Sequence, residues 1–428
     1  MSYDVVIIGS GPAGMFAADW LSKKNLDVLV LDEGRDIHER NCPRVKDGVC
    51  RDCRPCNIMC GVGGSGVYSD GTLNLRYDIG GDLSELTGKQ EAKDLVRQVD
   101  KVFLELGAVD NLYGDDDEAA HNLEIKAASV GVKFIRIPQR HMGSENTPEI
   151  IRRYAEKLRG QGVEFRFKAR VKDILSDGEV CGGVILEEGE KIFSQATLMA
   201  PGRVGAEWAD ELAQRRDIKR DYGPIDVGVR VEVPSLIMEE AVSVNRDPKF
   251  HIQTDSYDDF VRTFCTNHEG FVVEERYDGY VGVNGHSMRE EKSGNTNFAF
   301  LVRMSLKEPL VDSIKYGDFI SKLTTTIGGG RPVVQRLHEL RCGKRTHPNE
   351  LERNPLQPTL KNTTCGDVSM ALPHRVLVDV LEGLEKLNKV IPGVSEDSTL
   401  LYAPEVKYYA TRYVVYEDMQ SSLKGLFA

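Results

Sequence analysis

The sequence predicts an α/β protein in which a doubly wound parallel sheet carries an inserted α+β domain. Three observations predict it: a strand, helix and strand within the first 33 residues, a glycine-rich turn between the first two of these elements, and strand-like alternation after about residue 222. The 428 residues suffice for two domains of ordinary size. We therefore expect a first domain over 1–221, an inserted substrate domain over 222–394, and a return to the first domain over 395–428.

The first strand turns into a helix at a glycine motif. Residues 4–8 read Asp-Val-Val-Ile-Ile and lead into Gly9, Gly11 and Gly14, which have the spacing G-x-G-x-x-G. In this motif the first glycine permits a tight turn, the second lets a pyrophosphate approach the backbone, and the third lets the helix pack close to the strand. Pro12 suits the first helical turn, where its missing N–H costs nothing.

The helix and the second strand complete the motif. Apolar residues recur at helical spacing, which predicts a buried face made of Ala13, Phe16, Ala17, Trp20 and Leu21. A strand over 28–31 then ends at Asp32, eighteen residues after Gly14. A carboxylate about 20 residues after the glycines meets the ribose hydroxyls of a dinucleotide. The combination predicts an adenine-dinucleotide site of Rossmann type.

Charge and composition limit the classes of binding partner and the cellular compartment that we expect. The net charge of −12 produces no basic field, so we expect neither nucleic acid nor an anionic membrane as a partner. No apolar run approaches the roughly 18 residues of a membrane span, and the first strand begins too early to leave room for a secretory signal. Nine cysteines, an odd number, suit a reducing compartment. We therefore expect a cytoplasmic protein.

The rest of the chain alternates between regular patterns and one long irregular stretch. Residues 34–81 are rich in Cys, Gly, Pro and Arg, and so long an irregular segment is typical of a functional loop. Helices are expected near 95–106, 118–129, 147–158, 316–326 and 374–388. Strands are expected near 133–137, 163–167, 170–175, 180–187, 196–202, 227–233, 271–275, 280–284 and 297–304.

Several further segments carry a resemblance to a known family. They are Cys60 to Leu73 with the core Gly-Gly-Ser-Gly-Val-Tyr-Ser-Asp-Gly, Arg140 to Glu145, Ala200-Pro-Gly202, Thr263 to Gly270, Val283 to Arg289, Asn295 to Leu301, and Tyr402 to Lys407. With these, the chain resembles the two-dinucleotide-fold flavoproteins and, more narrowly, the largely uncharacterised family of FAD-dependent (NAD-utilising) dehydrogenases. The resemblance spans nearly the whole chain.

The resemblance implies an FAD-binding domain and a set of residues that hold the cofactor. The implied residues are Gly9, Gly11, Pro12, Ala13 and Gly14 at the pyrophosphate, Asp32 and Glu33 at the adenosine ribose, Gly63, Gly64, Ser65, Gly66 and Asp70 around the pyrophosphate and flavin, Val171 at the adenine, and Ala200 with Gly202 beneath the cofactor. Glycine-rich backbone is the kind that can approach a phosphate and an aromatic ring closely. The alternative for 61–71 is a flexible loop. The sequence ends at Ala428, where this class continues into a Gly-Asp segment, so we expect weak FAD binding by the chain as written.

A cysteine run precedes the second glycine segment. Cys50, Cys53, Cys56 and Cys60 have the C-x2-C-x2-C-x3-C spacing of a ferredoxin run, which leaves a single cluster, a zinc site, a redox pair and plain thiols as alternatives. We expect no bound metal, because the run has no partner run and few apolar neighbours. Arg51 and Arg54 are expected to lower the pKa of nearby thiols.

The expected activity is that of an FAD-dependent oxidoreductase acting on a small molecule. The residues of the family-like segments expected to face the flavin are His141, Cys265, His286 and Arg289, with His268 beside them. Each could donate a proton or anchor an acidic substrate, and the alternative for each histidine is a structural role. Only one dinucleotide motif is present, so electrons would pass to or from NAD(P)H bound transiently over the flavin, or an electron-transfer protein. A flavin monooxygenase, an unsaturated-bond reductase and a non-catalytic redox-sensing scaffold are the alternatives.

Overall fold

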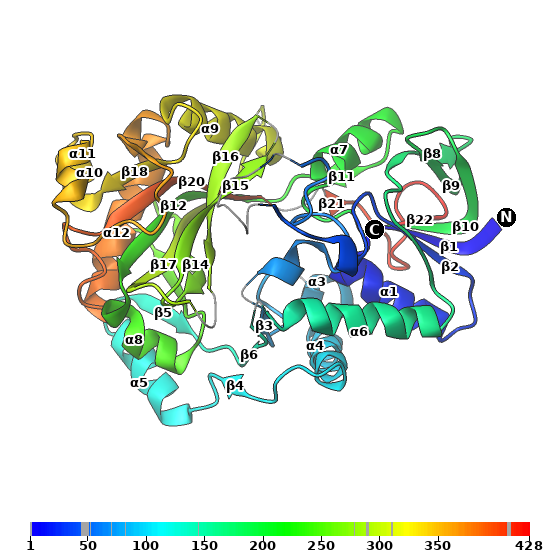
Figure 1. Ribbon diagram of the computed structural model, residues 1–428, viewed down its shortest axis with the longest axis horizontal. Coiled ribbons are helices and arrows are strands. Elements are labelled where there is room, and N and C mark those ends of the chain that lie inside the picture. The colour runs from blue at the N-terminus through cyan, green and yellow to red at the C-terminus, as the bar shows by residue number, and fades with distance from the viewer. Residues whose placement is uncertain are drawn as a thin grey trace.

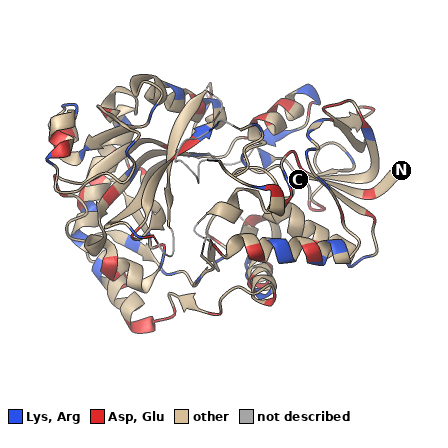
Figure 2. Ribbon diagram, viewed as in Figure 1, with Lys and Arg blue, Asp and Glu red and all other residues tan. Residues whose placement is uncertain are grey.

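The computed structural model describes residues 2–43, 51, 53–69, 71–81, 83–143, 145–277, 279–287, 291–309, 311–408 and 412–428. Two lobes lie side by side, each built around one sheet (Figure 1). The predictions made for Cys50, Asp70 and Arg289 fall outside the described residues. Both signs of charge are interspersed over the two lobes (Figure 2). Within the described part of the chain, no helix combines the length and apolar character needed to cross a membrane.

The first lobe contains the predicted parallel sheet. Its strand order is β7-β2-β1-β10-β9-β8, with β22 also paired to β10. The strands are β1 (Ser2–Ile8), β2 (Val28–Leu31), β7 (Glu164–Arg166), β8 (Val171–Ser176), β9 (Cys181–Leu186), β10 (Lys191–Met199) and β22 (Leu426–Phe427). Strands β7, β2, β1, β10 and β22 are parallel, whereas β8 and β9 form the predicted antiparallel meander.

Helices cover both faces of this sheet, which explains why β1 and β2 are apolar rather than alternating. Val5 and Ile7 pack into one core with α1 (Pro12–Ser22) and α6 (Thr147–Gly160). Val6 and Ile8 pack into another core with α7 (Ala206–Arg215). The doubly wound fold class predicted from the sequence is therefore confirmed.

The buried face predicted for α1 is wrong in part. Gly14, Met15 and Ala18 are buried, whereas Ala13 is exposed and the Trp20 side chain is 60% exposed. The helix is apolar nearly all round, so the spacing of its apolar residues did not select one face. Packing against the sheet selects it instead.

The second lobe is a mixed sheet with the strand order β19-β18-β20-β12-β17-β14-β13-β5. Its strands are β5 (Val132–Ile135), β12 (Ile225–Pro234), β13 (Lys249–Gln253), β14 (Phe260–Asn267), β17 (Asn295–Met304), β18 (Val333–Arg336), β19 (Thr364–Cys365) and β20 (Leu400–Tyr408). The helices α5 (Asp117–Ala128), α8 (Ser235–Val244) and α12 (His374–Val390) share its main apolar core. Alternation along β12 sends Val227, Val229 and Val231 into that core, so Asp226 and Arg230 lie on the opposite face.

Sheet membership does not follow the boundaries expected from the sequence. Helix α5 and strand β5, within 1–221, belong to the second lobe. Strand β20, within 395–428, also belongs to the second sheet, and the chain rejoins the first sheet only at β22. Strand partners are chosen by long-range pairing, which local patterns do not reveal. The second sheet is therefore assembled from two separate stretches of chain, β5 and the stretch from β12 to β20.

Smaller elements connect and cover the two sheets. The remaining strands are β3 (Thr72–Asn74), β4 (Leu112–Tyr113), β6 (Gln139–His141), β11 (Arg220–Asp221), β15 (Phe271–Tyr277), β16 (Tyr280–His286) and β21 (Arg412–Tyr413). The remaining helices are η1 (Ile37–Glu39), η2 (Gly64–Tyr68), α3 (Leu83–Thr87), α4 (Lys89–Glu105), α9 (Ser313–Ile327), α10 (Leu337–Arg341), α11 (Pro348–Glu352) and η3 (Val368–Met370). Strands β11 and β21 pair with each other where the chain passes between the lobes.

Candidate cofactor and substrate site

A cavity of about 390 Å³ lies at the carboxyl ends of β1, β2 and β10. Among the residues that line it are Gly9, Gly11, Pro12, Asp32, Glu33, Cys60, Gly64, Ser65, Gly66, Arg170, Val171, Ala200, Gly202, Arg203 and Trp208. In open α/β sheets, ligands bind outside the carboxyl ends of the strands, which is where this cavity lies. Eleven of the residues predicted to bind the cofactor thus line a single cavity. Ala13 and Gly14 lie at the start of α1, and Gly63 directly precedes η2.

The first glycine turn combines close packing with one open position. Gly9 has φ +107°, and a Cβ there would lie 2.1 Å from the carbonyl oxygen of Ala200. A Cβ on Gly14 would lie 2.0 Å from the carbonyl oxygen of Gly9, so the helix approaches the strand as closely as the motif predicts. A Cβ on Gly11 would instead have Gly64 Cα, 4.0 Å away, as its nearest neighbour. Helix α1 begins at this point with no acidic residue in its first turn, an arrangement suited to an anion.

The second glycine segment faces the first across the cavity. Gly64 has φ +62°, and a Cβ there would lie 3.2 Å from Gly11 Cα. The segment forms the short helix η2, and the buried Arg40 holds it by donating to the carbonyl oxygens of Gly64 and Ile58 at 2.9 and 2.7 Å and to that of Val62. The two backbones thus meet at one edge of the cavity, where neither glycine has a side chain to fill the space that a pyrophosphate would occupy, so the chain presents the cradle that FAD requires.

Two carboxylates at the end of β2 line the same cavity. Asp32 Oδ2 accepts hydrogen bonds from the backbone N and the Oγ of Ser10, at 2.9 and 2.6 Å, and its Oδ1 accepts one from Gly34 N at 2.7 Å. Glu33 Oε2 lies 3.4 Å from Arg170 Nε. The Asp32 carboxylate is thus held beside the glycine turn, where a ribose hydroxyl would donate to it.

The pKa of a cysteine that lines this cavity differs from the sequence prediction. Cys60 is buried in the cavity wall, and its Sγ donates to Glu33 Oε1 at 3.1 Å. Burial and the neighbouring Glu33 raise the pKa of Cys60, so the predicted lowering by Arg51 and Arg54 is wrong for this thiol. Over the part of the chain that the structure describes, no three or more His, Cys, Asp or Glu side chains are grouped to hold a metal. Because Cys50 lies outside that part, the absence of a metal stays a prediction.

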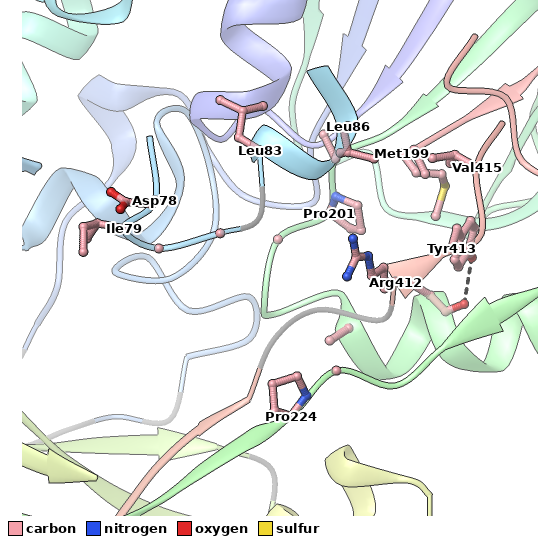
Figure 3. A pocket seen from close by; sticks show the side chains of 18 of the residues that line it. Asp78, Ile79, Leu83, Leu86, Met199, Pro201, Pro224, Arg412, Tyr413 and Val415 are labelled. Carbon is pink, nitrogen blue, oxygen red and sulfur yellow. Dashed lines mark hydrogen bonds between the residues drawn. The ribbon is translucent and has the colours of Figure 1, made fainter. Parts of the chain in front are cut away.

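A second cavity, of about 640 Å³, adjoins the first, and Ala200, Pro201 and Gly202 line both. Much of its wall is apolar, with Leu83, Leu86, Met199, Pro201, Tyr413 and Val415 around the open space (Figure 3). The Tyr413 hydroxyl is held by the carbonyl oxygen of Ala209 at 2.8 Å. Any molecule in this second cavity would therefore lie directly beside a bound dinucleotide.

The second sheet contributes a charged wall to this cavity. His251, Phe260, Arg262 and Arg303 from β13, β14 and β17 line it. The fully buried Asp226 on β12 accepts from Arg262 Nε at 3.0 Å and from Arg303 Nε at 3.2 Å. One carboxylate thus balances two guanidinium groups.

The pKa of His251 reflects this positive surrounding. Burial, followed by Arg262, Lys133, Arg303 and Lys249, lowers it from 6.5 to about 4. Because the folded state binds the proton less well than the unfolded state, stability is complete above pH 6.5 and is lost as the pH falls from 6.5 towards 4.

Replacing His251 by glutamine should remove this loss. As the pH falls from 6.5 to 4, the free energy of unfolding should decrease in both proteins. We expect the decrease in the wild type to exceed that in His251→Gln by at most about 3 kcal/mol. Urea unfolding at a series of pH values measures both slopes. His121→Gln, at a side chain that is 69% exposed, is the matched control and should keep the wild-type slope. Equal slopes for wild type and His251→Gln would contradict the assignment.

A buried ion network lies deeper on the same face of the sheet. Arg230 and Glu405 are fully buried, and Arg230 Nε donates to Glu405 Oε2 at 3.0 Å. Arg230 Nη1 also donates to Asn297 Oδ1 at 2.7 Å and to the carbonyl oxygen of Cys265 at 3.2 Å. Cys265 has φ +47°, at an irregularity in the pairing of β14 with β17. This network fixes the backbone of the segment that was predicted to face the flavin.

The structure separates the residues predicted to be catalytic. Cys265 lies beside Arg230, His286 ends β16, and His141 lies in the small sheet of β3, β4 and β6, with its Nδ1 3.3 Å from Thr72 Oγ1. None of these three lines either of the two cavities. His268 Nδ1 lies 3.0 Å from Thr296 Oγ1, and burial lowers the pKa of His268. The catalytic roles of all these residues stay predictions.

The charged wall was missed in the sequence. His251, Arg262 and Arg303 do not belong to any motif that carried the resemblance. A signal does exist in the sequence. Arg262 interrupts the largely apolar segment Phe260 to Phe264, and Arg303 ends the apolar run that begins at Phe298. An arginine on an otherwise apolar strand indicates a partner or a ligand on one face of the sheet.

Known proteins match the chain in three consecutive parts. Residues 3–52 match the pyridine nucleotide-disulphide oxidoreductase family, residues 82–220 the FAD binding domain family, and residues 224–408 the family described as FAD-dependent protein, C-terminal domain-like. The last match ends at the final residue of β20, as the second sheet does.

Among individual proteins, an uncharacterized protein of Clostridium beijerinckii is 23% identical over 431 residues, which covers 94% of this chain and 71% of that protein. Digeranylgeranylglycerophospholipid reductase of Methanosarcina mazei is 34% identical over 88 residues, 18% of this chain and 21% of that protein.

Solved structures resemble the chain more distantly. Glycine oxidase from Bacillus cereus is 14% identical with a TM-score of 0.38, covering all of this chain and 90% of its own. L-proline dehydrogenase from P. horikoshii is 14% identical with a TM-score of 0.42, covering all of this chain and 87% of its own. At such TM-scores these likenesses name no substrate. The family matches to FAD-binding proteins confirm the predicted cofactor, and the chain is an FAD-dependent oxidoreductase.

Proposed function

We propose that this oxidoreductase is a dehydrogenase that transfers a hydride through N5 of FAD between an organic substrate and NAD(P)H or a protein electron partner. The observation that supports it is the pair of adjoining cavities, which share the wall Ala200 to Gly202. One cavity has the glycine cradle for the dinucleotide, and the other is large enough for a small organic molecule. We also propose that the second sheet and its helices serve as the substrate domain.

FAD bound in the first cavity supplies a ring that can accept or give up a hydride. The residues of the chain hold and orient it. Gly11 and Gly64, which have no side chains, would leave room for the pyrophosphate beside their backbones, and Asp32, oriented by Ser10, would accept a hydrogen bond from the ribose. A substrate seated against the apolar wall around Pro201 would displace water from the second cavity, which would protect the hydride from side reactions.

The proposal is tested by reducing FAD-loaded protein without oxygen. NADH or NADPH should bleach the visible flavin absorbance within the time of a turnover, and addition of an oxidised quinone-type acceptor should restore it. Dithionite, which reduces flavin without a binding site, is the control. Bleaching by dithionite together with none by either nicotinamide would overturn the NAD(P)H part, and electron transfer from a ferredoxin would then be the remaining route.

An unsaturated-bond reductase is a second candidate. The 88-residue match to digeranylgeranylglycerophospholipid reductase and the apolar second cavity both favour it. The two candidates differ in the product, since a reductase leaves a saturated carbon–carbon bond in the substrate. Oxygen consumption with NADPH would instead identify a flavin monooxygenase.

Replacing Asp32 by alanine should weaken FAD binding at least about tenfold. The variant loses a charge-assisted hydrogen bond to the ribose, and such bonds contribute about 1.5–3 kcal/mol. Flavin fluorescence titration of the apoprotein measures the dissociation constant. Ser10→Ala removes the Ser10 Oγ–Asp32 bond but keeps the carboxylate, so its affinity should stay within about threefold of wild type. Equal affinity of Asp32→Ala and wild type would show that the ribose lies elsewhere.

A further inference from the structure

We propose that the second cavity binds an apolar organic acid, with its carboxylate at the wall made of Arg262 and Arg303 and its hydrocarbon part against the wall made of Leu83, Leu86 and Val415. This inference rests on the proposed function and names its substrate class. Figure 3 shows the apolar wall, which comes from α3, the end of β10 and the segment after β21.

Part of the apolar wall is exposed to water, and a bound ligand would cover it. Leu86 is 50% exposed although it faces a cavity of about 640 Å³, within the range of small-molecule sites. Met199, Pro201 and Val415 extend the same wall. An apolar chain in this cavity would remove these surfaces from water, which is the main source of affinity for such molecules.

The opposite wall carries an excess of positive charge. Asp226 is the carboxylate bound by both Arg262 and Arg303, so this cluster of three holds a net charge of +1. Two other charged residues that line the cavity, Asp78 and Arg412, have partners of opposite sign. Asp78 pairs with Arg76, and Arg412 pairs with Glu85. Among the lining residues that the structure describes, the positive surplus from these printed ion pairs lies on the side of the second sheet.

The pairing of the strands holds these charged side chains in place. Asp226, Arg303 and Phe260 are direct cross-strand neighbours on β12, β17 and β14. The Arg303 guanidinium lies 5.2 Å from the centre of the Phe260 ring, and His251 packs edge-on against the same ring at 4.8 Å. The lowered pKa of His251 is consistent with a positive potential here. Such an arrangement favours one carboxylate over a neutral or cationic group.

The occupant would also lie beside the flavin. The segment Ala200 to Gly202 lines both cavities, so a molecule held between the two walls reaches the boundary with the dinucleotide site. Arg303 and Arg262 fix the acid end, which leaves the hydrocarbon part to approach the cofactor. These arginines are therefore positioning residues for the substrate.

The test measures binding of decanoate and of decanol to the FAD-loaded protein by titration calorimetry. We expect decanoate to bind, and decanol, which has the same chain without the charge, to bind at least about tenfold more weakly. Decanoate should also shift the visible flavin bands, because it lies beside the ring. Absence of decanoate binding, or equal binding of decanol, would overturn the inference.

Variants place the binding in this cavity. Arg303→Gln and Leu86→Asp should each weaken decanoate at least about tenfold. Leu86 is 50% exposed, and Asp226 keeps Arg262 in Arg303→Gln, so both variants should fold, which circular dichroism checks. Arg97→Gln, at an exposed ion pair on α4, is the matched control and should bind like wild type. Unchanged binding in both cavity variants would overturn the inference. Failure of flavin reduction by NADH and NADPH with selective decanoate binding intact would overturn the proposed donor and leave the substrate class standing.

Discussion

Valine in place of Gly11 should abolish FAD binding without unfolding the protein. The Cβ of residue 11 would point into the cavity between α1 and η2, where its nearest neighbour is Gly64 Cα at 4.0 Å. A Cβ at residue 11 therefore makes only an ordinary contact when no cofactor is bound. A pyrophosphate that lies against this backbone leaves no room for a side chain. The purified variant should contain no flavin, and the apoprotein should show no flavin fluorescence change on titration with FAD.

Two comparisons separate this result from general damage. Gly182→Val makes the same substitution in β9, where the added Cβ also meets nothing within 4 Å and φ is not positive, and it should retain flavin. Gly9→Val should unfold the protein, because its Cβ would collide with the Ala200 carbonyl. Circular dichroism reports the fold in each case. A Gly11→Val protein that retains FAD would show that the pyrophosphate does not lie at this turn.

Replacing Arg230 by methionine should destabilise the protein by about 3–5 kcal/mol. The substitution removes the guanidinium from the fully buried Glu405, which keeps Lys407 with its Nζ 2.9 Å from Glu405 Oε1. Loss of a partner by a buried charge is strongly unfavourable. Asn297 Oδ1 also loses the Arg230 donor, whereas the carbonyl oxygen of Cys265 keeps Asn267 Nδ2 at 2.8 Å. The free energy of unfolding, obtained from urea titration followed by circular dichroism, measures the loss.

The double variant Arg230→Met/Glu405→Met should recover part of that stability, since it removes the buried carboxylate that lost Arg230, although Lys407 then loses its bond to Glu405. Arg97→Met breaks the exposed pair with Asp94 and should cost less than about 1 kcal/mol. If Arg230→Met is no less stable than Arg97→Met, the buried pair contributes nothing to the fold.

The cofactor site could be predicted because its determinants are local. A turn that needs glycine at residue 9, an open position at residue 11 and a carboxylate ending the next strand all fall within one strand-helix-strand unit. The glycine segment near residue 64, which the resemblance assigned to the cofactor, lines the same cavity, and its contact with the cofactor stays a prediction. Backbone requirements of this kind leave a direct trace in the choice of residue.

The substrate side could not be predicted in the same way. Asp226, Arg262 and Arg303 meet because β12, β14 and β17 pair across the sheet, and no short motif records that pairing. For the same reason α5 and β5 were assigned to the wrong lobe, although their own extents were predicted nearly correctly. The face of α1 was misjudged because its composition is apolar nearly all round.

The late position of β20 in the chain has a consequence for how this protein forms. Strand β12 is flanked by β17 and β20, so its hydrogen-bonding edge on one side stays open until residues near 400 have been synthesised. Pairing across nearly 170 residues closes a very long loop, which slows folding. During that interval β12 presents an apolar, unpaired edge to other chains. Newly made molecules therefore pass through a period in which self-association competes with completion of the sheet, and chaperones that mask strand edges would raise the yield.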